Sequence, residues 1–157
     1  MKIFIYFFII FIFTGCSLKN YEHSEAKVII IKSPKIKFAD VGYIRHTDKN
    51  IGLELFSAGH LIQKIEINHL ICLNNGCMTK SGFNEDYLYY EYPSDIMQNI
   101  ILGQPIYNSK RLEKTKNGFS QIIRDGGVRI KYIVTNSSIY FKDKKNKILI
   151  KIKDFNK

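Results

Sequence analysis

The sequence contains no tryptophan, only three cysteines and three prolines, and no hydrophobic run long enough to cross a membrane as a helix. Its longest apolar run, at residues 3–13, has eleven residues, whereas a transmembrane helix needs about 20. Internal repeats and long low-complexity tracts are also missing. The run at residues 3–13 therefore has the length of the apolar part of a signal peptide rather than that of a membrane span.

A cysteine follows this run almost directly. Thr14 and Gly15 are small residues, and they stand between Phe13 and Cys16. The arrangement resembles the lipobox of bacterial lipoproteins, in which the cysteine thiol is acylated and becomes the new N-terminus. We predict a lipoprotein signal peptide at residues 1–15, a lipidated polar tether at residues 16–26 and a single domain at residues 27–157. The alternative is a secretory signal with a chance cysteine near its end.

Basic residues outnumber acidic ones by 24 to 14, which gives a formal charge of +10. The excess is lysine, and together with 27 isoleucines it is typical of the codon usage of an AT-rich genome. No arginine cluster or basic helix is present, and an exported protein rarely meets nucleic acid. We therefore predict no nucleic-acid partner and, at most, a weak attraction to anionic lipid head groups.

The other two cysteines, Cys72 and Cys77, lie in the stretch ICLNNGCM. The four residues between them, LNNG, predict a tight hairpin that places the two cysteines side by side. An oxidising compartment would allow a disulfide there. A thiol redox site or a metal clamp is the alternative, but the spacing is not C-x-x-C and no further metal ligand lies nearby. A structural disulfide is the favoured interpretation.

Most of the domain has the alternating pattern of β-strands. In the last segment Ile148, Ile150 and Ile152 fall on one side and lysines largely on the other, which is typical of a sheet with one buried face. Gly59, with Ser57 and Ala58 before it, marks a turn between two such segments. We predict seven to nine strands in one antiparallel sheet, with a polar linker over residues 107–118.

One segment, SDIMQNIILGQP, carries the signals of a helix. Ser94 can cap its N-terminus, and Gly103 followed by Pro105 can end it. Four apolar residues share one face at helical spacing: Ile96, Met97, Ile100 and Ile101. A shorter helix is expected within residues 83–90. The predicted fold class is mainly β with some α, as a curved antiparallel sheet or unclosed β half-barrel with a helical lid on its concave face.

No set of residues supports catalysis. The four histidines have no partners at metal-ligand spacing, and the serines have no nucleophile-elbow context. The stretch RHTD at residues 45–48 contains an acid and a base, but its position at a strand end favours solvated turn residues. We expect no enzymatic activity, no metal and no cofactor.

The helical segment and its surroundings resemble a known family. SDIMQNIILGQPIYN is similar to the helix-then-LGxP segment of LolB, the outer-membrane receptor of lipoproteins. Downstream, GFSQIIRDGGVRIKYIV and IYFKDKKNKILIKIKDF follow in the family's order, with Phe155 near its terminal aromatic position. Upstream, IGLELFSAGHLIQKIEIN is similar to its central hairpin. The resemblance extends over residues 38–155, and the chain also resembles small lipoproteins of epsilon-class proteobacteria.

This resemblance implies an unclosed, eleven-stranded β half-barrel whose apolar cavity receives acyl chains from a soluble periplasmic carrier. Inward-facing residues of the strands would line the cavity: Leu53, Leu55, Ile65, Ile67, Ile130, Tyr132, Ile148 and Ile150. Ile96, Ile100 and Ile101 would form the lid. Phe56 or Leu61, beside the turn at residues 57–60, would contact the membrane in place of the family's loop leucine.

The predicted function follows from this resemblance. The chain would be an outer-membrane lipoprotein, anchored by Cys16 and facing the periplasm, that binds acyl chains of other lipoproteins and inserts them into the outer membrane. Ser17 after the cysteine resembles the outer-membrane address. The partners would be lipoprotein cargo and a periplasmic carrier, with the receptor itself a monomer. The alternative is a structural accessory lipoprotein of an outer-membrane complex, with the same fold used as a protein-binding module.

Overall fold

The computed structural model of the chain describes residues 23–155. Within this range eleven strands form one sheet: β1 (His23–Lys32), β2 (Lys37–His46), β3 (Ile51–Ser57), β4 (His60–Ile67), β5 (Ile71–Leu73), β6 (Gly76–Met78), β7 (Leu112–Thr115), β8 (Gly118–Asp125), β9 (Val128–Thr135), β10 (Ser138–Asp143) and β11 (Ile148–Asp154). Helices α2 (Lys80–Tyr87) and α3 (Ile96–Ile101) and the short 3-10 helix η2 (Tyr107–Ser109) lie between β6 and β7.

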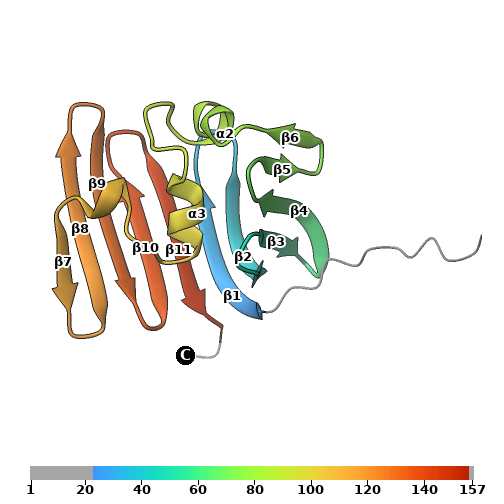
Figure 1. Ribbon diagram of the computed structural model, residues 1–157. Helices are drawn as coiled ribbons and strands as arrows, with labels where there is room; N and C mark the ends of the chain where they lie inside the picture. Colours follow the sequence, from blue (N-terminus) through green and yellow to red (C-terminus); the bar gives the residue numbers. More distant parts are fainter. Residues whose placement is uncertain (1–22, 156–157) are drawn as a thin grey trace, which may run out of the picture.

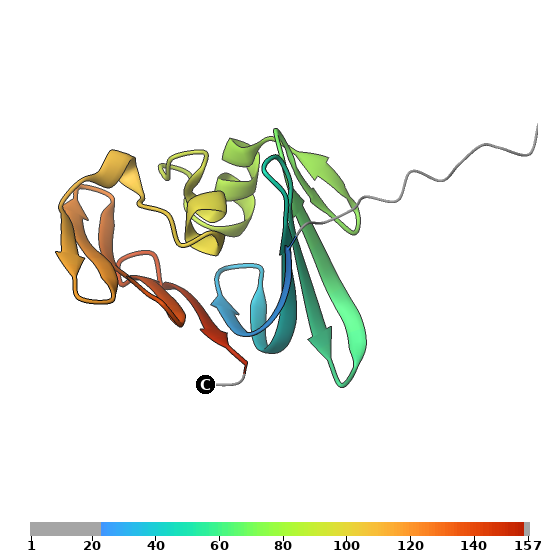
Figure 2. The same ribbon diagram turned by 60° about the horizontal axis from the view of Figure 1, so that its bottom comes forward.

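The strands are antiparallel, in the order β6-β5-β4-β3-β2-β1-β11-β10-β9-β8-β7. The first and last strands therefore pair in the middle, with Ile29 opposite Ile152, while β6 and β7 are free edges. The sheet bends strongly without closing, and the helical segment lies within the bend (Figures 1 and 2). The predicted fold class is confirmed. The seven to nine strands expected from the alternation are too few, whereas the eleven strands implied by the resemblance are present.

Alternating isoleucines and leucines build the core between the sheet and α3. Ile29 and Ile31 on β1 and Ile150 on β11 are at most 2% exposed, and the apolar residues of α3 are buried in the same core. Burying such a side chain stabilises a fold by roughly 1.5–3 kcal/mol. This concave face of the sheet is thus the apolar one, as the period of two in the sequence requires.

Helix α3 ends where the sequence indicates. Gly103 has a φ of 63°, and its N–H donates to Ile100 O, while Gln104 N–H donates to Asn99 O. These two bonds form a Schellman motif, which favours glycine at the left-handed position. The N-terminus differs from the prediction, because Asp95 and not Ser94 is the capping residue, and its side chain makes no capping hydrogen bond to the backbone.

Four further boundaries correct the sequence-based predictions. Strand β1 begins at His23, inside the expected tether, and α2 begins at Lys80, earlier than the helix expected within residues 83–90. A turn at Asn68 separates β4 from β5, although the sequence pattern there predicts one continuous strand. The side-chain oxygen of Asn68 accepts a hydrogen bond from Leu70 N–H at 2.8 Å. The expected linker at residues 107–118 contains η2 and the edge strand β7.

No helix among residues 23–155 is both long and apolar enough to span a membrane. The predicted signal peptide and Cys16 lie outside the described residues.

Candidate functional site

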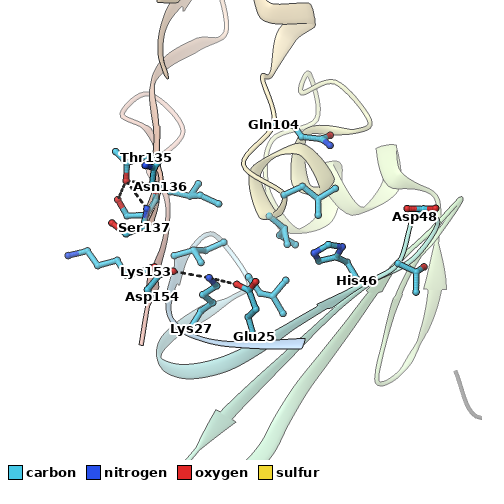
Figure 3. A pocket seen from close by; sticks show the side chains of 17 residues that line it. Glu25, Lys27, His46, Asp48, Gln104, Thr135, Asn136, Ser137, Lys153 and Asp154 are labelled. Atoms are coloured by element: carbon cyan, nitrogen blue, oxygen red, sulfur yellow. Dashed lines mark hydrogen bonds and ion pairs between the residues drawn. The ribbon is translucent and has the colours of Figure 1, made fainter. Parts of the chain in front are cut away.

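A cleft of about 470 Å³ opens at one end of the concave face, beside the C-terminus of α3 (Figure 3). The ends of β1, β2 and β11 form one part of its wall, and the turn between β9 and β10 forms another. Ligand-binding clefts in proteins typically have volumes of roughly 300–1,000 Å³. The cleft therefore has the size of a site for a small molecule or part of a larger one.

The floor of the cleft is apolar. Ile44, Ile101 and Ile152 are buried there, and Leu102 and Ile139 are half-buried beside them. Ile44, Ile139 and Ile152 come from strands that the pairing of β1 with both β2 and β11 brings together, and the packing of α3 adds Ile101 and Leu102. Because half-buried apolar atoms lose water when a ligand covers them, this floor favours an apolar group.

The rim is polar and carries a group of charges. Lys27 Nζ donates to Asp154 Oδ1 at 2.8 Å and also pairs with Glu25, and all three side chains line the cleft (Figure 3). Burial alone would lower the pKa of Lys27, but the hydrogen bonds to Asp154 and Glu25 outweigh it, so the pKa rises. Lys27 therefore stays charged over the physiological pH range.

Two histidines flank the charged group. His46 lines the cleft and stacks on His23, the residue opposite it in β1, with ring centroids 4.8 Å apart. Thr47 and Asp48, in the turn after β2, continue the rim. The stretch RHTD thus forms a strand end and a turn, as predicted, and three of its residues also belong to the wall of this cleft.

The predicted cavity residues lie elsewhere. Leu53, Leu55, Ile65, Ile67, Ile130, Tyr132, Ile148 and Ile150 face the concave side, but each is at most 2% exposed. They pack in one core with Ile96 and Ile100 of the predicted lid, and none of the eight lines the cleft. The structure therefore shows these eight residues inside a closed core, which they share with buried residues of the helical segment, and not as the lining of an open cavity. Of the predicted lid residues, Ile101 does line the cleft.

Tyr132 has a polar role that its pattern in the sequence does not reveal. Its hydroxyl donates to Gln104 O at 2.9 Å and to Asn99 O at 3.3 Å, both at the C-terminal end of α3. The last carbonyls of a helix have no partner within the helix itself. Tyr132 therefore fastens α3 to the sheet, and burial raises the pKa of its hydroxyl.

Phe56 and Leu61, predicted to contact the membrane, lie opposite each other beside the β3–β4 turn. The turn itself is Ala58–Gly59, with φ of 49° and 82°. Leu61 is 48% exposed, whereas Phe56 is half-buried and packs edge-on against Tyr43. Leu61 is thus the more accessible of the two to another surface.

Cys72 and Cys77 are joined by a disulfide across the β5–β6 hairpin, where they face each other in register. Within this turn the positive φ occurs at its glycine, Gly76, which has a φ of 140°. The disulfide lies at the β6 edge, away from the cleft.

Sequence reasoning missed the rim of the cleft. Glu25 fell in the expected tether, and Lys27 and Asp154 looked like ordinary polar ends of strands. One signal was available: Glu25 and Lys27 continue the alternation of Ile29 and Ile31 on the same face of β1. Their proximity to Asp154, however, depends on the pairing of the first strand with the last.

Chemically, the cleft can hold an amphipathic group, with apolar atoms on its floor and a polar part at its rim. The described residues contain no cluster of three His, Cys, Asp or Glu side chains that could hold a metal ion. Comparison with known proteins gave no match, whether to family models, to curated proteins or to solved structures.

Proposed function

We propose that the chain is a LolB-like lipoprotein that accepts the acyl chains of other lipoproteins and passes them to the outer membrane. The observation that carries this proposal is the cleft at the open end of the concave face, with its apolar floor beside α3 and its polar rim. An unclosed eleven-stranded sheet with helices in its bend is also the architecture that the resemblance implies.

In this proposal the first part of an acyl chain lies on Ile139, Leu102 and Ile152, and the polar linkage remains at the rim. Each buried methylene contributes about 0.8 kcal/mol. A longer segment enters only if α3 moves off the sheet, which would uncover core residues beneath it such as Tyr132. Transfer would be passive, since apolar area only changes place between the carrier, this domain and the bilayer.

The proposal can be tested with a fluorescent fatty acid and the full chain carrying Cys16→Ser, so that no attached lipid competes. Ile139→Gln and Leu102→Gln change half-buried residues of the floor. We expect the double variant to bind the probe about thirtyfold more weakly, because each of the two substitutions removes apolar contact worth about 1 kcal/mol.

Ile122→Gln is the matched control, since this isoleucine is 44% exposed and lies outside the cleft. Equal affinity of the wild type and the floor variant would contradict the proposal, and so would an equal loss in the control. In cells, depletion of the protein should leave lipoproteins outside the outer membrane, and unchanged fractionation would contradict the transfer role.

A second candidate function is favoured by a specific observation. The complete burial of the eight predicted cavity residues indicates a solid interior, as in a protein-binding module of an outer-membrane complex. Co-purification with a membrane barrel protein, without binding of the fatty-acid probe, would favour this accessory role.

A further inference from the structure

The charges of the sheet are separated between its two faces. Six neighbouring strands make up the centre and one side of the sheet: β2, β1, β11, β10, β9 and β8. Every acidic residue on them holds a position in register with residues of the concave face: Glu25, Asp40, Asp125, Asp143 and Asp154. The outward positions of the same strands, all within the described residues, carry no carboxylate and many lysines and arginines. The convex side of these six strands is thus a uniformly cationic surface, while β3, β4 and β7 beside them carry outward carboxylates at Glu54, Glu66 and Glu113.

We define the basic face as six outward-facing residues: Lys32, Lys37, Arg129, Lys131, Lys142 and Lys151. Four of them belong to one cross-strand row, which runs Ile122–Lys131–Lys142–Leu149–Lys32–Lys37 in direct register from β8 to β2. The row crosses six strands and is therefore about 24 Å long, at roughly 4.8 Å between strands. It follows the outer side of the bend, which the helices leave uncovered (Figure 2).

The basic face contains like charges in direct opposition. Lys131 faces Lys142, Lys32 faces Lys37, and Arg124 faces Arg129 beside them. Like charges opposite each other destabilise a sheet. No ion pair to another described residue relieves these repulsions. The repulsion lowers the stability of the isolated domain, and an anionic partner that covers the basic face would relieve it.

We infer that the basic face docks onto an anionic phospholipid surface. Lysines distributed along six strands, and not gathered around one site, fit many phosphates in a fluid layer better than one acidic peptide. The residues between the cations are mostly aliphatic, including Ile122 and Leu149 in the row and Ile30 beside it. One aromatic ring, that of Tyr140, lies among them, and Lys151 covers it. A site for single-stranded nucleic acid would instead offer several open rings for successive bases to stack on.

An apolar depression adds to this fit. It has a volume of about 330 Å³ and lies at the β1–β2 hairpin, where Ile30, Phe38 and Ala39 line it together with Lys32 and Lys37. Proteins that bind at the membrane interface combine buried apolar area with cations near the head groups. With the basic face on the lipid, the cleft on the opposite face of the sheet would point away from the bilayer. This inference does not depend on the proposed function of the cleft.

Vesicle co-sedimentation tests the inference, with the full chain carrying Cys16→Ser in every protein. Binding to vesicles rich in phosphatidylglycerol is divided by binding to pure phosphatidylcholine. The N-terminal segment is the same in every protein and therefore contributes equally to all the ratios compared. The face variant combines Lys131→Gln with Lys142→Gln. We expect it to lower this ratio about 25-fold, because each of the two cations near an anionic surface strengthens binding roughly fivefold. High salt should lower the wild-type ratio as well.

The matched control is Lys114→Gln with Lys116→Gln, which removes the same charge from the exposed β7–β8 hairpin. It should keep the ratio within about threefold of the wild type. Folding does not confound the test, since the face variant removes a repulsive pair and should unfold at the same or a higher urea concentration. A wild-type ratio near one, or equal losses in both variants, would overturn the inference. So would loss of binding to polyglutamate with unchanged vesicle binding, because the partner would then be an acidic protein.

Discussion

The side chain of Gln121 and the backbone of Ile106 form a pair of hydrogen bonds. Ile106 N–H donates to Gln121 Oε1, and Gln121 Nε2 donates to Ile106 O, both at 2.9 Å. The same amide nitrogen donates to Lys110 O at 2.8 Å. Between these two backbone positions the chain makes a left-handed turn, with φ of 50°, 51° and 62° at residues 107–109. One buried glutamine of β8 thus holds both ends of a strained turn that leads from the helices into β7.

Replacing this glutamine should be costly. Gln121→Leu leaves the N–H and the O of Ile106 buried without these partners and releases the turn. We expect the free energy of unfolding to fall by about 3 kcal/mol, measured by urea denaturation. Gln63→Leu is the control, because Gln63 bonds only to the adjacent carbonyl of Lys64 and lies half-buried. Equal stability of the wild type and Gln121→Leu would show that the turn at residues 107–109 is stable without this glutamine.

Tyr132→Phe tests how α3 is fastened. The substitution keeps the ring and removes the hydroxyl that donates to Gln104 O and Asn99 O. We expect a loss of about 1 kcal/mol in the free energy of unfolding and faster hydrogen exchange at the amides of α3. Tyr140→Phe on the outer face should change neither quantity. Unaltered exchange in Tyr132→Phe would mean that packing alone holds the helix.

Asp143 should govern stability in acid. The side chain is fully buried, and it accepts hydrogen bonds from Tyr92 Oη at 2.7 Å and from the N–H groups of Arg129 and Lys145. Burial alone would raise the pKa of Asp143, but hydrogen bonds from Tyr92, Asn146 and Arg129 outweigh it, so the pKa is lowered. A lowered pKa in the folded state means stability that is present above the unfolded value near 4.

This stability is lost as the pH falls below about 4, through the pKa of the folded state. We expect Asp143→Asn to unfold more easily than the wild type at pH 7, by about 2–3 kcal/mol, because its uncharged amide cannot accept all these bonds. Its stability should also change less with pH in the acid range. Urea titrations at a series of pH values measure both effects, and parallel pH profiles would contradict the assignment.

The disulfide should contribute modestly, since it closes a short loop. Reduction, or Cys72→Ser with Cys77→Ser, should lower the free energy of unfolding by about 2 kcal/mol. Binding of the fatty-acid probe should not change, because the disulfide lies away from the cleft. A loss of probe binding on reduction would indicate a redox role for the cysteine pair.

The sequence predicts those parts of the fold that depend on local pattern. The alternation of Ile148, Ile150 and Ile152 identifies β11 and its buried face, and Gly103 with Pro105 identifies the end of α3. It fails where a side-chain contact decides the outcome. Asn68 turns the chain and splits one apparent strand, and Gln121 stabilises structure in a segment that looks like a polar linker.

The candidate site could not be predicted from local pattern, because its parts are far apart in the sequence. Glu25, Gln104 and Asp154 come together only through the pairing of β1 with β11 and the packing of α3. The period of two does place Leu53 and Ile150 correctly on the concave face. Whether that face is open or covered depends on where α3 packs, and the alternation of residues within a strand does not predict this.

The central claim is that acyl chains enter the cleft beside α3, and photo-crosslinking measures this most directly. A lipopeptide with a photoreactive group on its acyl chain is irradiated with the full chain carrying Cys16→Ser, and the adducts are mapped by mass spectrometry. The account predicts adducts at residues 101–104 and 135–139, which are diminished in the Ile139→Gln and Leu102→Gln double variant. Adducts confined to the outer face around Ile122 and Leu149, or adducts unaffected by the double variant, would contradict it.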